Sequence, residues 1–198
     1  MTAVDTVLHA HSVAEIGLYF ILTPCPSCGR FALRPRGLPG PPDESHVAHW
    51  LTAGCAACLR DYPSVFLIEP APVVEPAGAP LPPVINPTFA PSRLIDLLGW
   101  IILYRHYVEQ TAQPVDARRM TLVAAQCLDE ALKFYPRGAA APPVEAFFSA
   151  RSRERFRTHP REFDRTIVLA HRQRLPRAEV ASVSRGERPR WWRRWLRR

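Results

Sequence analysis

Long hydrophobic runs are missing from this chain of 198 residues. No stretch reaches the roughly 18 uninterrupted apolar residues of a membrane-spanning helix, so no such helix is predicted. The first apolar run, IGLYFIL, follows the acidic residues Asp5 and Glu15 and has no basic segment before it, which does not fit a secretory signal. Five cysteines without an export signal indicate the cytoplasm, a reducing compartment, and metal ligation rather than disulfides.

The motifs of the common enzyme classes are missing as well. The sequence holds no phosphate-binding loop, nucleophile elbow, pair of catalytic carboxylates or zinc-hydrolase signature. Cys127 falls in an apolar stripe at helical spacing, where a free cysteine is typical of a packed core. We therefore expect a protein that is not an enzyme and has no small-molecule substrate.

The net charge of +8 is concentrated in one part of the chain. Residues 1–80 carry four arginines against seven acids, a net −3, and residues 81–140 carry six basic groups against five acids, a net +1. Residues 141–198 carry sixteen arginines against six acids, a net +10. A partner that recognises positive charge is therefore expected at the last third of the chain.

A proline-rich stretch divides the sequence. Eight prolines lie between residues 70 and 91, and because proline fixes φ and lacks a backbone donor, this stretch is predicted to be an extended spacer. The predicted parts are a module over residues 1–70, a linker over 71–91, a helical bundle over 92–176 and a tail over 177–198.

The first module is predicted to hold one helix and short strands. Ser12 and Glu15 have the spacing of a capping box, which predicts a helix over SVAEIGLYFILT. The segments HVAHWLT and SVFLI predict strands on either side of the sequence CAAC. The expected fold class is α+β, a small β module followed by an all-α bundle of about four helices.

Four helices are predicted after the spacer. The first begins after Ser92 as its N-cap and is apolar almost all round, as a buried helix must be. The second covers residues 116–135, the third begins near Pro143, and the fourth covers 160–175. The second helix has an apolar stripe made of Met120, Val123, Ala124, Cys127, Leu128, Ala131, Leu132 and Tyr135.

Two Cys-x-x-Cys pairs are the strongest chemical signal in the sequence. Cys25 and Cys28 lie in CPSCG, and Cys55 and Cys58 lie in CAAC. Each such turn places two sulfurs on one side of a tight loop, so two turns can close a tetrahedron of thiolates around zinc. The 26 residues between the pairs exceed the roughly 15 to 20 that are typical. A longer loop adds little entropy cost, so the spacing remains compatible with a metal site.

These two motifs resemble the knuckles of the zinc-ribbon family, over the N-terminal third of the chain only. The resemblance implies a pair of β-hairpins around one Zn²⁺, with Cys25, Cys28, Cys55 and Cys58 as ligands. It does not imply one task, because zinc ribbons serve transcription factors, ribosomal proteins, polymerase subunits and protein adaptors.

A structural zinc is the interpretation that we adopt for the four cysteines. Four thiolates fill the tetrahedral shell, whereas a catalytic zinc keeps one position for water. A redox dithiol and unrelated cysteines are the alternatives. His46 and His49 lie nearby in sequence and could replace a ligand, lie around the ligands or lie on the surface. Zinc would chiefly supply folding free energy, since a segment of about 60 residues buries little surface on its own.

The chain ends in RWWRRWLRR, which separates tryptophan and leucine from arginine on a helical wheel. Such a short peptide is not a stable helix in water, so we expect it to order on a surface. An anionic membrane, an acidic groove of a protein partner, nucleic acid and the chain's own bundle all fit. The candidate contact residues are Arg190, Trp191, Trp192, Arg193, Arg194, Trp195, Leu196, Arg197 and Arg198.

Two functional hypotheses follow from the sequence. The first is a non-catalytic zinc-binding adaptor or scaffold that joins protein partners, with or without a peripheral membrane contact. The second is a nucleic-acid-binding regulator that uses the basic last third. A redox switch, in which thiol oxidation releases the zinc, is a third and weaker idea.

Overall fold

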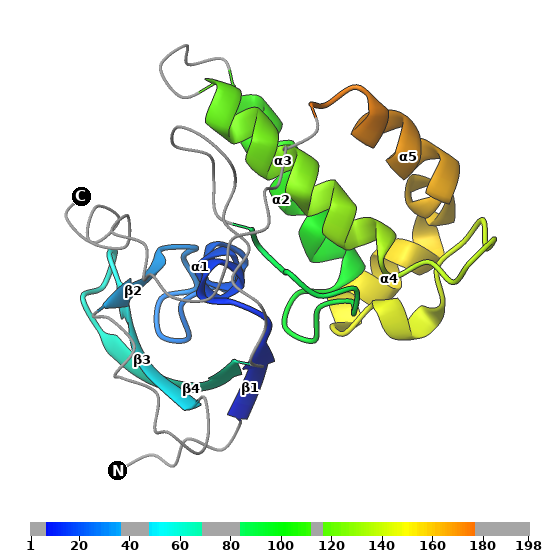
Figure 1. The fold of residues 1–198 in the computed structure, drawn as a ribbon. Helices are drawn as coiled ribbons and strands as arrows, with labels where there is room; N and C mark the ends of the chain where they lie inside the picture. Colours follow the sequence, from blue (N-terminus) through cyan, green and yellow to red (C-terminus); the bar gives the residue numbers. More distant parts are fainter. Residues whose placement is uncertain (1–6, 37–47, 69–83, 112–116, 177–198) are drawn as a thin grey trace.

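A computed structural model describes residues 7–36, 48–68, 84–111 and 117–176. The predicted α+β class is confirmed: a four-stranded sheet lies in the N-terminal half, and four α-helices of the described chain lie in the C-terminal half (Figure 1). The predicted division into four parts stays a prediction. Most of the linker and the whole tail lie outside the described residues.

The sheet has the strand order β1-β4-β3-β2. The strands β3 (Ala48–Cys55) and β4 (Asp61–Ile68) form an antiparallel hairpin and confirm the two predicted strands. Strand β2 (Leu33–Arg36) pairs antiparallel with β3, and β1 (Val7–Ala10) pairs parallel with β4. No strand was predicted at β1, because this four-residue parallel edge strand depends on a partner almost 60 residues away.

Helix α1 (Val13–Leu22) packs on one face of this sheet. The predicted cap is confirmed, since the Ser12 side chain accepts a hydrogen bond from the Glu15 amide at 3.1 Å. The Phe20 ring meets the Phe66 ring of β4 edge-on, with ring centroids 5.8 Å apart. The composition of IGLYFIL favours a strand. The Ser12 cap and the packing of one side of this segment against the sheet favour the helix instead.

The C-terminal half is built on a pair of long helices. Helices α2 (Leu97–Gln110) and α3 (Ala117–Leu132) lie side by side, and α5 (Arg165–Gln173) packs against α3 (Figure 1). Helix α4 (Ala150–Thr158) and the short 3₁₀ helices η1 (Val144–Ala146) and η2 (Pro160–Phe163) complete this half. The predicted stripe of α3 is confirmed, because all eight of its residues are buried or pack against the core.

Three predicted helix starts are wrong. The N-cap of α2 is Asp96, whose side chain accepts from the Gly99 amide at 2.8 Å, while Ser92 caps the turn before the helix. The segment after Pro143 forms only η1, and α4 begins later, after Ser149, where two serines form a reciprocal capping box. The segment at 160 likewise begins as η2, and α5 starts at Arg165. These three α-helices begin four, seven and five residues after the predicted starts at 93, 143 and 160.

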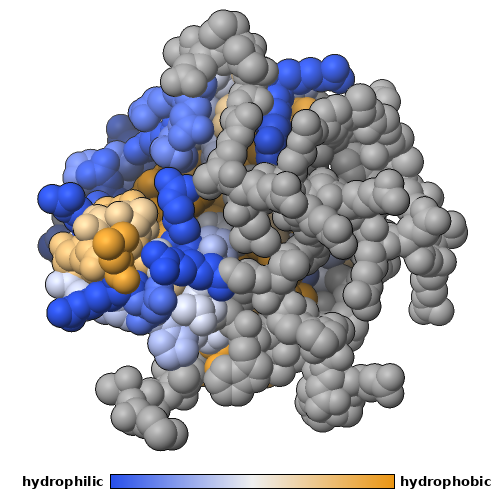
Figure 2. All heavy atoms as spheres, turned by 90° about the vertical axis from the view of Figure 1, so that its left-hand side faces the viewer, coloured by the Kyte–Doolittle hydropathy of each residue, from blue (hydrophilic) through white to orange (hydrophobic). Residues whose placement is uncertain are grey.

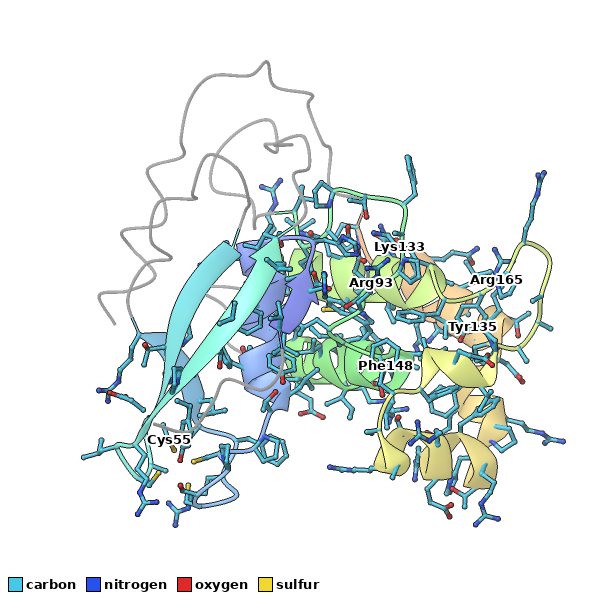
Figure 3. The ribbon with its side chains drawn as sticks, turned by 90° about the horizontal axis from the view of Figure 1, so that it is seen from below. Cys55, Arg93, Lys133, Tyr135, Phe148 and Arg165 are labelled. Carbon is cyan, nitrogen blue, oxygen red and sulfur yellow. The ribbon has the colours of Figure 1, made fainter. Side chains whose placement is uncertain are left out.

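A buried polar cluster connects the N-terminal module to α3. Glu15 of α1 and Glu130 of α3 are both almost fully buried. The Glu130 carboxylate accepts hydrogen bonds from the Asn86 side chain at 3.0 Å and from Lys133 at 2.7 Å. Ser12 donates to the carbonyl of Ile85, so the described end of the proline-rich stretch lies between α1 and α3. Lys133, labelled in Figure 3, directly follows the last residue of α3.

Candidate metal centre

The two cysteine pairs lie at the same end of the sheet. The first knuckle connects α1 to β2, and the second is the turn between β3 and β4. Figure 3 shows Cys55 at this end of the strands, with other sulfur atoms close by. The hairpin thus supplies one half of the site, and the chain leaving α1 supplies the other.

The sulfur positions fit a tetrahedral zinc. The Sγ atoms of Cys25 and Cys58 are 3.6 Å apart, and those of Cys28 and Cys55 are 3.7 Å apart. All four ligand atoms lie within 4.8 Å of one another. A tetrahedron with zinc–sulfur bonds of about 2.3 Å has sulfur–sulfur edges of about 3.8 Å. The four predicted cysteines are therefore together, and a metal ion fits among them.

The two knuckles have the same backbone geometry. In each knuckle, the backbone amide of the first cysteine donates a hydrogen bond to the carbonyl of the residue five positions later. The amide of the residue four positions later donates to the carbonyl of the first cysteine. These bonds join Cys25 to Arg30 and Gly29 at 2.8 Å, and Cys55 to Arg60 and Leu59 at 2.9 Å. The sequence did not predict that the two knuckles share this geometry, because only the first has a glycine after its second cysteine.

The position after the second cysteine is left-handed in both knuckles. Gly29 has φ of +70° and Leu59 has φ of +61°. A left-handed residue with a Cβ costs about 1–2 kcal/mol, which glycine avoids. The Leu59 side chain is 73% exposed and gives little packing in return. The second knuckle therefore carries backbone strain that the first lacks.

Leu59→Gly is expected to stabilise the folded chain by about 0.5–1 kcal/mol, which is the relief of backbone strain less the extra conformational entropy of an unfolded glycine. Thermal unfolding with zinc present measures this. Gly29→Ala is the reciprocal variant: no atom crowds the added Cβ, so only the backbone conformation opposes it. It should destabilise by a similar amount, and equal signs for the two variants would contradict the explanation.

Hydrogen bonds within the cluster move the pKa values of Cys25 and Cys28 in opposite directions. Burial raises the pKa of Cys25, but hydrogen bonds from Tyr62 and from the knuckle amides outweigh it and lower the pKa to about 6. The Tyr62 hydroxyl lies 3.2 Å from this sulfur. The pKa of Cys28 is instead raised to about 11: the Arg30 amide lowers it, while burial and hydrogen bonds with the other three thiols together raise it. Four adjacent thiolates repel, and a divalent cation removes that repulsion.

Several contacts around the sulfurs had no sequence signal. Tyr62 lies beside Cys25, and Arg60 of the second knuckle donates to Ser27 of the first at 3.1 Å. The Ala56 amide donates to Ala32 at 2.9 Å and connects the knuckles again. No short motif marks these residues, since each contact spans more than 20 positions of sequence.

Other predicted site residues lie outside the described residues. The tail from Arg190 to Arg198 is not described, nor are the side chains of His46 and His49. Their predicted roles stay predictions. Within the described residues, the four cysteines form the single group of three or more metal-ligating side chains, and no helix has the length and apolar character to cross a bilayer.

Comparisons of this chain with protein-family models, with curated proteins and with solved structures found no match. The zinc-ribbon resemblance therefore rests on the two motifs and on the sulfur geometry.

Proposed function

We propose that this chain is a non-catalytic adaptor, in which one Zn²⁺ holds the N-terminal module in shape and the two knuckles form a protein-binding surface. The ligands would be Cys25, Cys28, Cys55 and Cys58. Zinc supplies folding free energy at such a site, because four thiolates leave no coordination position for a substrate or water.

The exposure of apolar side chains on the knuckles carries this proposal. Phe31 is 61% exposed and Leu59 is 73% exposed, and each lies next to an exposed arginine, Arg30 or Arg60. Figure 2 views the molecule from the β2 side and shows a small apolar area bordered by hydrophilic residues. Aromatic and arginine side chains are the residue types enriched at the centres of protein interfaces. The metal holds both knuckles rigid, so little entropy is lost when a partner binds.

The structure gives less support to nucleic-acid binding. Some arginines of the described helices are already paired, since Arg155 contacts Glu162, Arg157 contacts Glu154 and Arg172 contacts Asp129. Residues 177–198 hold eight arginines and two acids, which is +6 of the +10 in the last third. The basic surface that this alternative needs is therefore mainly in the tail.

A photoreactive benzoylphenylalanine at position 31, in cells that express the chain, tests the adaptor proposal. We expect it to crosslink one protein that the same residue at position 89 does not. Phe89 is fully exposed and lies outside the knuckles, so it reports on non-specific capture. The crosslinked protein is then purified, and its Kd for the full chain is measured by calorimetry.

Phe31→Ser should raise that Kd about tenfold, the effect of losing one apolar anchor. Leu59→Gly should also raise it, although the same variant is expected to stabilise the fold, so binding and stability separate. Phe89→Ser is the matched control and should leave Kd unchanged. Identical crosslinks from positions 31 and 89, or an unchanged Kd for Phe31→Ser, would reject the knuckles as the binding surface.

A further inference from the structure

A hollow of about 250 Å³ lies among α2, α3, η2 and α5, away from the cysteines. Its floor is apolar and buried: Ile101 of α2, Leu128 of α3 and Val168 of α5 are each at most 5% exposed. Ile167, which is 40% exposed, lines the hollow where it reaches the surface. The hollow therefore belongs entirely to the helical half and does not depend on the metal site.

The remaining five lining residues are polar, and two of them are arginines. Arg105 comes from α2, and Arg161 comes from η2. The Tyr104 hydroxyl and His171 Nδ1 are 3.1 Å apart, so these two side chains hold each other in place on one wall. Apolar surface and positive charge thus meet in one small space.

The charges around the hollow do not cancel. Glu162 is its one acidic residue, and both of its oxygens accept hydrogen bonds from Arg155, at 2.5 and 3.1 Å. Arg105 approaches the same carboxylate only to 3.9 Å. The guanidinium of Arg161 has no ion-pair or hydrogen-bond partner within the described part of the chain, and Arg161 is exposed. The Arg161 guanidinium is therefore available to an anion above the apolar floor, and Arg105, which is held only by the long 3.9 Å ion pair with Glu162, can contact the same anion.

We propose that this hollow is a binding site for a small organic acid, with its apolar body on the floor formed by Ile101, Leu128 and Val168 and its carboxylate beside Arg105 and Arg161. The volume limits the ligand: an engineered cavity of about 150 Å³ holds benzene, so about 250 Å³ suits a body of roughly eight to ten carbon atoms. The site is separate from the knuckles and goes beyond the adaptor function.

Both parts of such a ligand are required by the composition of the site. A short carboxylate such as acetate would leave the apolar floor in contact with water, and a neutral chain would leave the guanidinium groups without a counter-charge. An apolar cation would be repelled by Arg105 and Arg161. Affinity should therefore depend on the charge and on the chain together.

Titration of octanoate into the full, zinc-loaded chain tests the site, with the methyl resonances of isoleucine, leucine and valine followed by NMR. We expect shifts at Ile101, Leu128 and Val168, a Kd at least about fivefold lower than that of 1-octanol, and no shift with acetate. Arg161→Gln should raise the octanoate Kd about fivefold, as expected for one solvent-exposed charge contact. Ile167→Trp should abolish binding, because the larger side chain fills the hollow from its exposed side.

Arg174→Gln is the matched control, since Arg174 is exposed at the end of α5 but does not line the hollow. It should leave the octanoate Kd unchanged. Equal effects of Arg161→Gln and Arg174→Gln would mean that only the net charge of the chain attracts octanoate. Equal affinities for octanoate and 1-octanol, shifts confined to other methyl groups, or no shifts at millimolar octanoate would each overturn the proposal.

Discussion

Chelation of the proposed zinc is expected to unfold the sheet of the N-terminal module, and Cys55→Ser is expected to have the same result. Cys55 is fully buried at the junction of β3 with the second knuckle, so its replacement removes one of the four proposed ligands and leaves a polar hydroxyl in the core. Structural zinc supplies roughly 10–16 kcal/mol in small peptides, more than the whole stability of an average domain. The effect should therefore be a loss of structure rather than a shift in melting temperature.

Two measurements check this expectation. Elemental analysis of purified, reduced protein should give one zinc per chain, and hydrogen exchange should show protection of the β3 and β4 amides that disappears on chelation. Cys127→Ala is the matched control. Cys127 is buried among the helices and lies outside the cluster of four sulfurs. It should keep one zinc per chain. A sheet that stays protected without metal would overturn the zinc interpretation.

Local sequence patterns predicted most of the elements because their causes are local. The Ser12 cap of α1 and the stripe of α3 both depend on residues within one or two turns, so both predictions are confirmed. Helix starts were less predictable where two capping residues compete. Asp96, not Ser92, is the N-cap of α2. The Ser92 hydroxyl instead accepts hydrogen bonds from the amides of Leu94 and Ile95 in the turn before the helix.

The remaining features depend on contacts between distant residues. The β1 segment is a strand only because β4 lies beside it, and the hollow forms only when α2, α3, η2 and α5 pack together. The proximity of the four sulfurs is also a contact between distant residues, but it was predictable. Two Cys-x-x-Cys turns commonly bind one metal ion together, and this brings their sulfurs into one cluster. A cluster of metal-ligating residues is thus one of the few long-range contacts that can be predicted from a short sequence motif.

The composition of the sequence singles out Lys133, but no role was predicted for it. Lys133 is the only lysine among 26 basic residues. Its ammonium group donates to Asn86 O at 3.3 Å, to Thr88 O at 2.7 Å and to Glu130 at 2.7 Å. A compact ammonium directs its three donors to three separate acceptors, whereas the planar guanidinium of arginine has a fixed fork. A lone lysine in an arginine-rich chain can therefore mark a site that arginine does not fit.

The pKa of Glu130 links this site to pH. Burial raises the pKa from its ordinary value to about 7, and the ammonium of Lys133 opposes part of the rise. Burial also raises the pKa of Glu15, and the like charge of the Glu15 carboxylate contributes to the raised pKa of Glu130. A carboxyl group with a raised pKa in the folded state binds its proton more tightly there than in the unfolded chain. The free energy of unfolding that it contributes therefore falls as pH rises towards 7 and stays low above it.

Lys133→Met is expected to destabilise the protein by about 3 kcal/mol at pH 8, because it leaves the buried, ionised Glu130 without its counter-charge. At pH 5.5 the loss should be smaller, since Glu130 is then protonated in the folded state. Urea unfolding followed by circular dichroism, with the variant and the original chain compared at each pH, measures the difference and cancels the pH dependence of zinc binding.

The double variant Lys133→Met with Glu130→Gln separates charge from packing. It removes both charges but keeps an amide that still accepts a hydrogen bond from Asn86. Relative to the original chain, it should lose less stability at pH 8 than Lys133→Met alone. The difference between these two variants should shrink as pH falls below 7, where Glu130 in the single variant loses its charge. If the two variants are equally unstable at pH 8, the lysine acts through its bonds to Asn86 and Thr88, and the unpaired charge of Glu130 is not the cause.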